Sequence, residues 1–126
     1  MCGVALKDFD YLNYLDKFNW IKSYSGHLLG ICAGAQIIGK VFGEQLKKGQ
    51  EIGLIKIKKI KQDKILDNVI LNEVYALHNF YVDTPKNFEL LLETKYPQLF
   101  TTGKIYASLF HPEIRNKNII SNFINL

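Results

Sequence analysis

The feature that most constrains the fold is a short apolar segment that runs through a glycine-flanked turn directly into a helical pattern. Residues 27–31 form an almost unbroken apolar run, which is typical of a strand buried in a parallel sheet. Residues 33–42 are small and apolar with helical periodicity, and Gly43 follows them as a stop signal. A strand, a tight turn and a helix in immediate succession predict a sheet with helices packed against it.

The rest of the chain contains apolar patterns of both helical and strand periodicity. Helices are predicted over residues 11–24 and 117–126. Strands are predicted over residues 54–59, 73–77, 88–93 and 104–110. The order of helix, strand, helix, several strands and helix predicts a single α/β domain that covers residues 1–126.

Cys32 stands in the turn, between Gly30 and Gly34. A side chain on a sharp strand-to-helix turn points outward, and flanking glycines leave room for the crowded backbone. We expect the helix N-terminus to favour a thiolate over a thiol, and the N–H of Ala33 to face the oxygen of a bound carbonyl. The pattern indicates a nucleophile, although this motif alone leaves open a small buried cysteine in a glycine-rich turn.

A second motif, Phe-His-Pro-Glu, follows the strand predicted over residues 104–110 and ends at Glu113. It places His111 at the carboxyl end of a strand, which is the edge of an α/β sheet where ligands bind. A histidine there can accept the thiol proton and later protonate a leaving amine. Glu113 can hold the imidazole in the required tautomer. We therefore expect Cys32, His111 and Glu113 to form a catalytic triad.

Together the motifs resemble the signature of the class I glutamine amidotransferases, a Gly-x-Cys-x-Gly-x-Gln elbow followed by Phe-His-Pro-Glu near the C-terminus. Residues 51–53, residues 78–82 and the Asn122-Phe123 pair extend the likeness over essentially the whole chain. Among the subfamilies, the sequence most resembles the separate amidotransferase subunit of archaeal-type GMP synthase. The resemblance implies a flavodoxin-like sheet, glutamine as substrate, a glutamyl thioester on Cys32, and ammonia passed to a synthetase partner.

The resemblance also implies four further site residues. Gln36 and the loop around His78 would help to hold the glutamine, although either side chain could instead be structural. Gly3 or Val4 would supply a second oxyanion N–H beside that of the residue after the cysteine. His27, at the start of a buried strand, is expected to be structural.

The chain departs from the family pattern at three places. Leu109 stands where the family commonly has glutamine, and Phe80 stands where an acidic residue is usual, which puts substrate fit and partner communication in question. At the start, the family has a Gly-Gly-Pro-like sequence, of which this chain shows one glycine, Gly3. About two strand–helix units that precede this segment in the family are not found here. We therefore expect a fold without its N-terminal strand–helix units, and self-association or completion of the sheet by another chain.

Composition argues against several classes of function. The net charge of +4 comes from 16 basic and 12 acidic residues, and lysines near residues 56–64 indicate a solvated strand face rather than a nucleic-acid surface. No apolar run approaches the length that spans a bilayer. The cysteines, Cys2 and Cys32, show no paired Cys/His spacing, so we expect no metal, no cofactor and a reduced, cytoplasmic setting.

Two other functions remain open at this point. A γ-glutamyl hydrolase or peptidase would use the same Cys–His pair on γ-glutamyl amides, and a binding or regulatory module would keep the fold without turnover. Ammonia release from free glutamine indicates the amidotransferase, and cleavage of γ-glutamyl peptides indicates the hydrolase. Failure of Cys32 to react with a glutamine-mimicking electrophile indicates the module.

Overall fold

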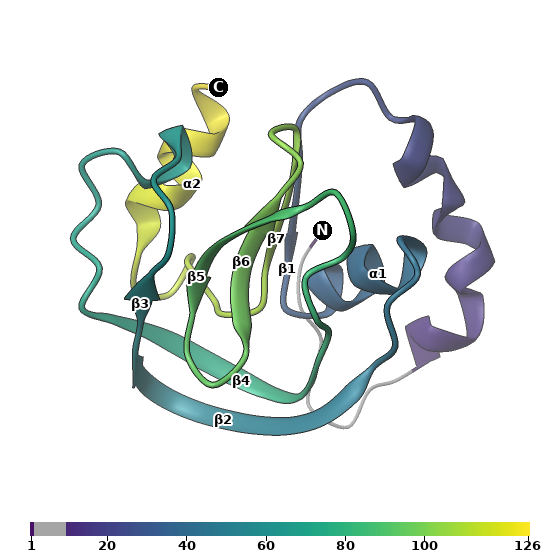
Figure 1. Ribbon diagram of the computed structural model, residues 1–126, viewed down its shortest axis with the longest axis horizontal. Coiled ribbons are helices and arrows are strands. Elements are labelled where there is room, and N and C mark those ends of the chain that lie inside the picture. Colours follow the sequence, from purple (N-terminus) through teal and green to yellow (C-terminus); the bar gives the residue numbers. More distant parts are fainter. Residues whose placement is uncertain (2–9) are drawn as a thin grey trace.

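The computed structural model describes residue 1 and residues 10–126, and its centre is a five-stranded sheet (Figure 1). The strands lie in the order β1, β7, β6, β5, β3. Their bounds are Leu28–Ile31 (β1), Lys58–Lys59 (β3), Glu89–Glu93 (β5), Pro97–Thr101 (β6) and Ile105–Ser108 (β7). β1 and β7 run parallel, and the other neighbours are antiparallel. The parallel pair positions the site, because Cys32 and His111 both follow its carboxyl end.

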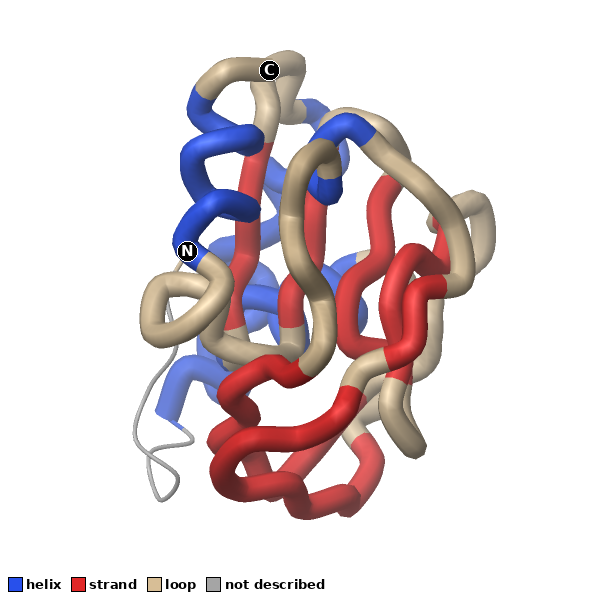
Figure 2. The backbone as a smooth tube through the Cα atoms, turned by 90° about the vertical axis from the view of Figure 1, so that its left-hand side faces the viewer, coloured by secondary structure: helices blue, strands red, loops and turns tan. Residues whose placement is uncertain are grey.

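A second sheet is an antiparallel ribbon of β2 (Lys47–Lys56) and β4 (Glu73–Tyr81). The pairing shifts register between Lys48 and Glu51, which bends a strand and re-aims its side chains. Figure 1 and Figure 2 both show this β2–β4 ribbon below the main sheet, beyond the ends of its strands. The ribbon is therefore placed to contact the segments that follow β1 and β7.

Helices cover both faces of the main sheet. Their bounds are Asp10–Ser23 (η1, a 3₁₀ helix), Ala33–Val41 (α1), Lys64–Leu66 (η2, also 3₁₀) and Lys117–Ile124 (α2). The helices η1 and α1 share one apolar core with the sheet, and η2 and α2 share the other. No helix in the described part of the chain is long and apolar enough to cross a bilayer.

Side chains of the parallel pair alternate between the two cores. Leu29 and Tyr106 belong to the core under α2, whereas Leu28 and Ile105 belong to the core under α1. Burial on both faces explains why the first strand is a continuous apolar run in the sequence. The predicted strand over 27–31 and the predicted helix over 33–42 are thus confirmed as β1 and α1.

The predicted helix over residues 11–24 is present but is a 3₁₀ helix, broken by non-helical dihedral angles at Tyr14. Its core-facing side chains explain the tighter winding. Leu15, Phe18 and Ile21 all pack into the α1-side core at a constant spacing of three residues. Residues at i and i+3 lie directly above one another in a 3₁₀ helix, so this spacing suits that conformation.

The predicted strand over residues 54–59 is divided between the end of β2 and β3, which belong to different sheets, and β4 continues past the predicted residues 73–77, so that residues 78–81 form strand rather than the expected loop. Two further differences have identifiable reasons. The ribbon strand β2 begins at Lys47 rather than at residue 54, because the buried positions in its first half are Gly49 and Glu51 rather than apolar residues. The sequence did not predict β6, which begins at Pro97. Proline within a strand pattern argues against a strand, but it is tolerated as the first residue, where it stands here.

Candidate active site

Cys32 occupies a strained turn between β1 and α1. Its backbone dihedral angles are φ 54° and ψ −102°, a left-handed conformation that is costly for a residue with a Cβ. The Cys32 N–H donates to the Ser108 carbonyl at 2.7 Å, which ties the turn to the end of β7. A Cβ on Gly30 would lie 2.6 Å from Ile38 and 2.7 Å from the Gly34 backbone, so glycine at position 30 lets α1 pack directly against β1.

The thiol of Cys32 is buried, with 5% of the residue exposed. Its S–H donates to the Leu77 carbonyl of β4 at 3.5 Å. Burial raises the pKa of Cys32 to about 11; the Ala33 N–H acts in the opposite direction, and the Glu113 charge adds to the rise. The expectation of a thiolate at the helix N-terminus is therefore wrong for the free protein, because desolvation of the charged sulfur outweighs the N–H group behind it.

His111 and Glu113 form a close pair at the end of β7. The imidazole Nδ1 lies 2.5 Å from Glu113 Oε1, which orients the ring. The other nitrogen, Nε2, is buried and has no hydrogen-bond partner among the residues that the structure describes. A neutral imidazole held through Nδ1–H presents Nε2 as a proton acceptor.

The ribbon strand β4 contacts both halves of the candidate triad. The His111 N–H donates to the Tyr75 carbonyl at 2.8 Å, and two residues further along β4 the Leu77 carbonyl accepts from Cys32. Alternate carbonyls of a strand are about 7 Å apart and point to the same side. The Cys32 N–H also donates to the Ser108 carbonyl at the end of β7. Together these contacts bring the expected nucleophile, base and orienting carboxylate to the same end of the sheet.

The other expected site residues have different surroundings. Ala33 is the first residue of α1, as expected, and Gln36 is buried with its Nε2 donating to the Phe80 carbonyl at 3.1 Å. The ring of His78 is buried and bonds to Glu51 at 3.0 Å rather than opening to a surface. Gly3 and Val4 lie outside the described residues.

Three polar residues beside the site were not predicted from the sequence: Glu51 and Gln98, which are buried, and Thr94, which is half-buried. Glu51 accepts hydrogen bonds from Thr94 and Gln98 as well as from His78. The signal that could have found them is the acidic residue at an inward position of an alternating strand, since a carboxylate is rarely buried without partners.

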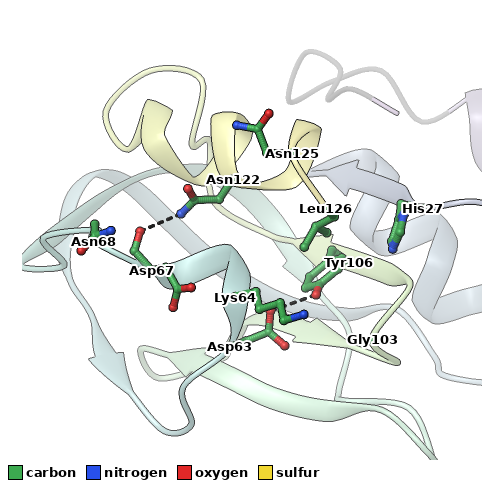
Figure 3. A pocket seen from close by; sticks show the side chains of 10 residues that line it. All are labelled: His27, Asp63, Lys64, Asp67, Asn68, Gly103, Tyr106, Asn122, Asn125 and Leu126. Atoms are coloured by element: carbon green, nitrogen blue, oxygen red, sulfur yellow. Dashed lines mark hydrogen bonds between the residues drawn. The ribbon is translucent and has the colours of Figure 1, made fainter.

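A large cavity lies at the opposite end of the sheet (Figure 3). It has a volume of about 830 Å³ and contains the Tyr106–Asp63 hydrogen bond and the bond from Asn122 to the Asp67 backbone. Its wall includes His27, which precedes the amino end of β1 and is exposed with its ring edge-on to Phe123. This cavity is therefore remote from Cys32 and His111.

Comparison with known proteins gives consistent relatives. The model of the family described as Glutamine amidotransferase class-I matches residues 13–125. The glutamine-hydrolyzing GMP synthase subunit of Sulfolobus acidocaldarius is 28% identical, over 94% of this chain and 71% of that protein. The glutamine-hydrolyzing GMP synthase of Wolbachia pipientis wMel is 33% identical, over 79% of this chain but only 22% of that protein.

Solved structures agree with the sequence comparison. A protein described as a GMP synthase subunit from Thermoplasma acidophilum superposes with a TM-score of 0.88 at 29% identity, over 98% of this chain and 69% of that one. A glutamine amidotransferase from Thermotoga maritima gives a TM-score of 0.72 at 24% identity, over 93% of this chain and 54% of that one, which supports the fold alone. Both the predicted family and the predicted fold are confirmed: the chain belongs to the class I glutamine amidotransferase family.

Proposed function

We propose that this chain hydrolyses glutamine to glutamate and ammonia, with Cys32 as nucleophile, His111 as general acid and base, and Glu113 as the group that orients the imidazole. One observation carries the proposal. Glu113 holds Nδ1 of His111 while Nε2 is buried without a partner among the described residues, and carbonyls two residues apart on β4 accept hydrogen bonds from His111 and Cys32. A buried and unsatisfied nitrogen is costly for stability, and such costs are characteristic of reactive sites.

The raised pKa of Cys32 shapes the first step. The thiol is neutral in the free protein, so its proton passes to Nε2 of His111 as the sulfur attacks the side-chain amide carbon of glutamine. The Ala33 N–H stabilises the resulting oxyanion, and we propose Gly3 or Val4 as a second donor. The imidazolium then protonates the amide nitrogen, which leaves as ammonia. The product of this half-reaction is a glutamyl thioester on Cys32.

The second half-reaction reverses the role of His111. The imidazole removes a proton from water, the hydroxide attacks the thioester carbonyl, and glutamate leaves as the sulfur regains its proton. Gln36 is proposed to support the end of β4, which forms in place of the expected loop around His78, because its side chain donates to the Phe80 carbonyl. For His78 we propose an indirect role, because its ring is buried against Glu51.

The proposed acceptor of the ammonia is a synthetase that makes GMP, since several relatives are described as subunits of GMP synthase. The chain spans 22% of the Wolbachia pipientis relative and between 58% and 71% of the GMP synthase subunits. We propose that another chain, or a second copy, associates with the β1 side of the described sheet, where the backbone of Met1 already bonds to Leu29 and Ile31. Mixing this chain with a GMP synthase whose own glutamine site is inactivated should restore glutamine-dependent GMP formation.

The test of the proposed chemistry is ammonia release from glutamine, with and without that synthetase. We expect Cys32→Ala to abolish turnover, and His111→Ala to reduce it on the order of 10³-fold or more. Tyr106→Phe, in the remote cavity, is the matched control and should retain activity. Full activity of Cys32→Ala would refute the mechanism, and preference for γ-glutamyl peptides over glutamine would favour the hydrolase instead.

A further inference from the structure

A buried carboxylate links the β2–β4 ribbon to the main sheet. Glu51 of β2 is only 4% exposed, and its Oε1 accepts hydrogen bonds from His78 Nε2 at 3.0 Å and Gln98 Nε2 at 2.7 Å. Its Oε2 accepts from Thr94 Oγ1 at 2.7 Å. His78 is the cross-strand partner of Glu51 on β4, whereas Gln98 belongs to β6 and Thr94 precedes it. The carboxylate therefore joins three strands from two sheets.

Glu51 remains ionised because its partners outweigh its burial. Burial alone raises the pKa of a carboxyl group, but the bonds from His78, Thr94 and Gln98 and the charge of His78 bring the pKa of Glu51 below its usual value. A buried carboxylate is tolerated only with donors in good geometry. The cluster therefore fixes the relative positions of the strands that supply those donors.

The cluster adjoins the contact of the ribbon with Cys32 and a main-sheet hydrogen bond close to His111. His78 directly follows Leu77, whose carbonyl accepts from the Cys32 thiol. On the other side, the Gln98 carbonyl accepts from the Leu109 N–H at 2.7 Å, two residues before His111. A shift of β4 would therefore move the carbonyl that holds the sulfur, without any change to Cys32 or His111 themselves.

We propose that Glu51 and His78 are positioning residues, which hold the Leu77 carbonyl against the Cys32 thiol and so keep the S–H bonded and the sulfur aimed in the free protein. The catalytic consequence rests on the proposed function, whereas the effect on the thiol does not. Neither side chain needs to touch substrate in this role. Among the residues that the structure describes, the nearby titratable groups that face the thiol edge are His111 and Glu113.

The test measures how fast iodoacetamide alkylates Cys32 as pH is raised, followed on the peptide that contains Cys32 by mass spectrometry. In Glu51→Gln and His78→Leu the carbonyl no longer holds the S–H, so the pKa of Cys32 should fall. Each unit of fall makes alkylation at pH 8 about tenfold faster. Turnover of glutamine should drop in the same variants, although the reactive thiolate is more abundant.

Three companion variants separate positioning from simple destabilisation. His78→Gln keeps an amide donor near the place of Nε2 and should retain an alkylation profile close to that of the unmodified protein. Thr94→Val removes one of the three hydrogen bonds to Glu51, and it should shift the alkylation profile in the same direction by a smaller amount. This variant takes the place of Glu51→Gln in the test if Glu51→Gln does not fold. Tyr106→Phe loses the bond to Asp63 at the remote end and should leave the profile unchanged.

Two results would overturn this inference. One is an unchanged alkylation profile in folded Glu51→Gln, or in Thr94→Val where Glu51→Gln does not fold. The other is a His78→Gln variant in which KM for glutamine rises while the alkylation profile stays the same, because that pattern belongs to a direct substrate contact. Absence of glutaminase activity in the unmodified protein would refute the proposed function but would leave the alkylation test valid.

Discussion

The environment of Cys32 sets its protonation state in the free protein. Besides the S–H bond to the Leu77 carbonyl, three influences act on the pKa of Cys32: burial, the Ala33 N–H and the charge of Glu113, of which burial is the largest. A helix N-terminus by itself would favour the anion. Here the thiol is enclosed and donates to a backbone carbonyl, so the neutral form is favoured. Proton transfer to His111 must therefore accompany the attack on substrate.

This balance predicts the reactivity of the unmodified protein. With the pKa of Cys32 near 11, the rate of alkylation by iodoacetamide should climb about tenfold per pH unit between pH 7 and 10, without levelling off. A small thiol such as N-acetylcysteine serves as the reference, and its alkylation rate should level off about one pH unit above its pKa, which is lower than that of Cys32. A plateau for Cys32 below pH 9 would show that the thiol is not desolvated as described.

Glu113 should have opposite effects on reactivity and on turnover. Its negative charge raises the pKa of Cys32, so Glu113→Gln should speed alkylation at pH 8. The same change removes the acceptor for Nδ1 of His111 and should slow glutamine hydrolysis by about 10²–10⁴-fold. Glu89→Gln, which neutralises a surface carboxylate paired to Lys61, is the control and should change neither rate. Equal slowing of both rates would instead indicate general damage to the fold.

At the level of elements, the site depends on how closely α1 approaches β1. The first turn of the helix lies over Gly30, where no side chain can be accommodated. This approach places the strained Cys32 backbone at the junction and keeps its N–H on Ser108. The strand–turn–helix unit thus positions the nucleophile through backbone packing rather than through side-chain bonds.

Gly30→Ala should therefore separate α1 from β1. The added Cβ meets backbone atoms of Gly34, which cannot turn away, and we expect the free energy of unfolding to fall by about 1–3 kcal/mol. Gly26→Ala is the matched control, because the three atoms nearest to its Cβ all belong to the exposed ring of Tyr24. Urea unfolding followed by circular dichroism gives both values. Similar stability in the two variants would contradict the described helix–strand contact.

The element boundaries show where sequence periodicity is informative. β1 and α1 were predicted almost to the residue, because nearly all of their positions are buried and most of these are apolar or small. The first half of β2 was missed, since its inward positions carry a glycine and a glutamate. The 3₁₀ winding of η1 was also missed, although the spacing of Leu15, Phe18 and Ile21 contained the information.

For the whole molecule, the association of ribbon and sheet should depend on pH through Glu51. The pKa of this carboxyl group is lower in the folded chain than its ordinary value of 4.5, so the folded state binds the proton less well than the unfolded state. Its contribution to stability is therefore complete above the unfolded value and is lost as pH falls through the folded value. Acid should weaken the link between the two sheets.

We expect the unfolding midpoint in urea to fall as pH is lowered from about 5 to 3, to a smaller degree in Glu51→Gln than in the unmodified protein. At pH 7 the variant should be less stable, because His78, Thr94 and Gln98 lose an ionised acceptor. Glu89→Gln again serves as the surface control. Identical pH dependence of the Glu51→Gln variant and the unmodified protein would exclude Glu51 as the group responsible.

The sequence by itself determined the α/β character of this chain, its family, and the candidate nucleophile and histidine, because these depend on local spacing: a glycine-flanked turn and a histidine at a strand end. Only the tertiary structure decided that Cys32 is a neutral thiol, that His78 bonds to Glu51, and that β4 contacts both Cys32 and His111. The reason is physical: desolvation and buried hydrogen bonds depend on residues about 30 to 80 positions apart, which meet only when the ribbon folds across the end of the sheet.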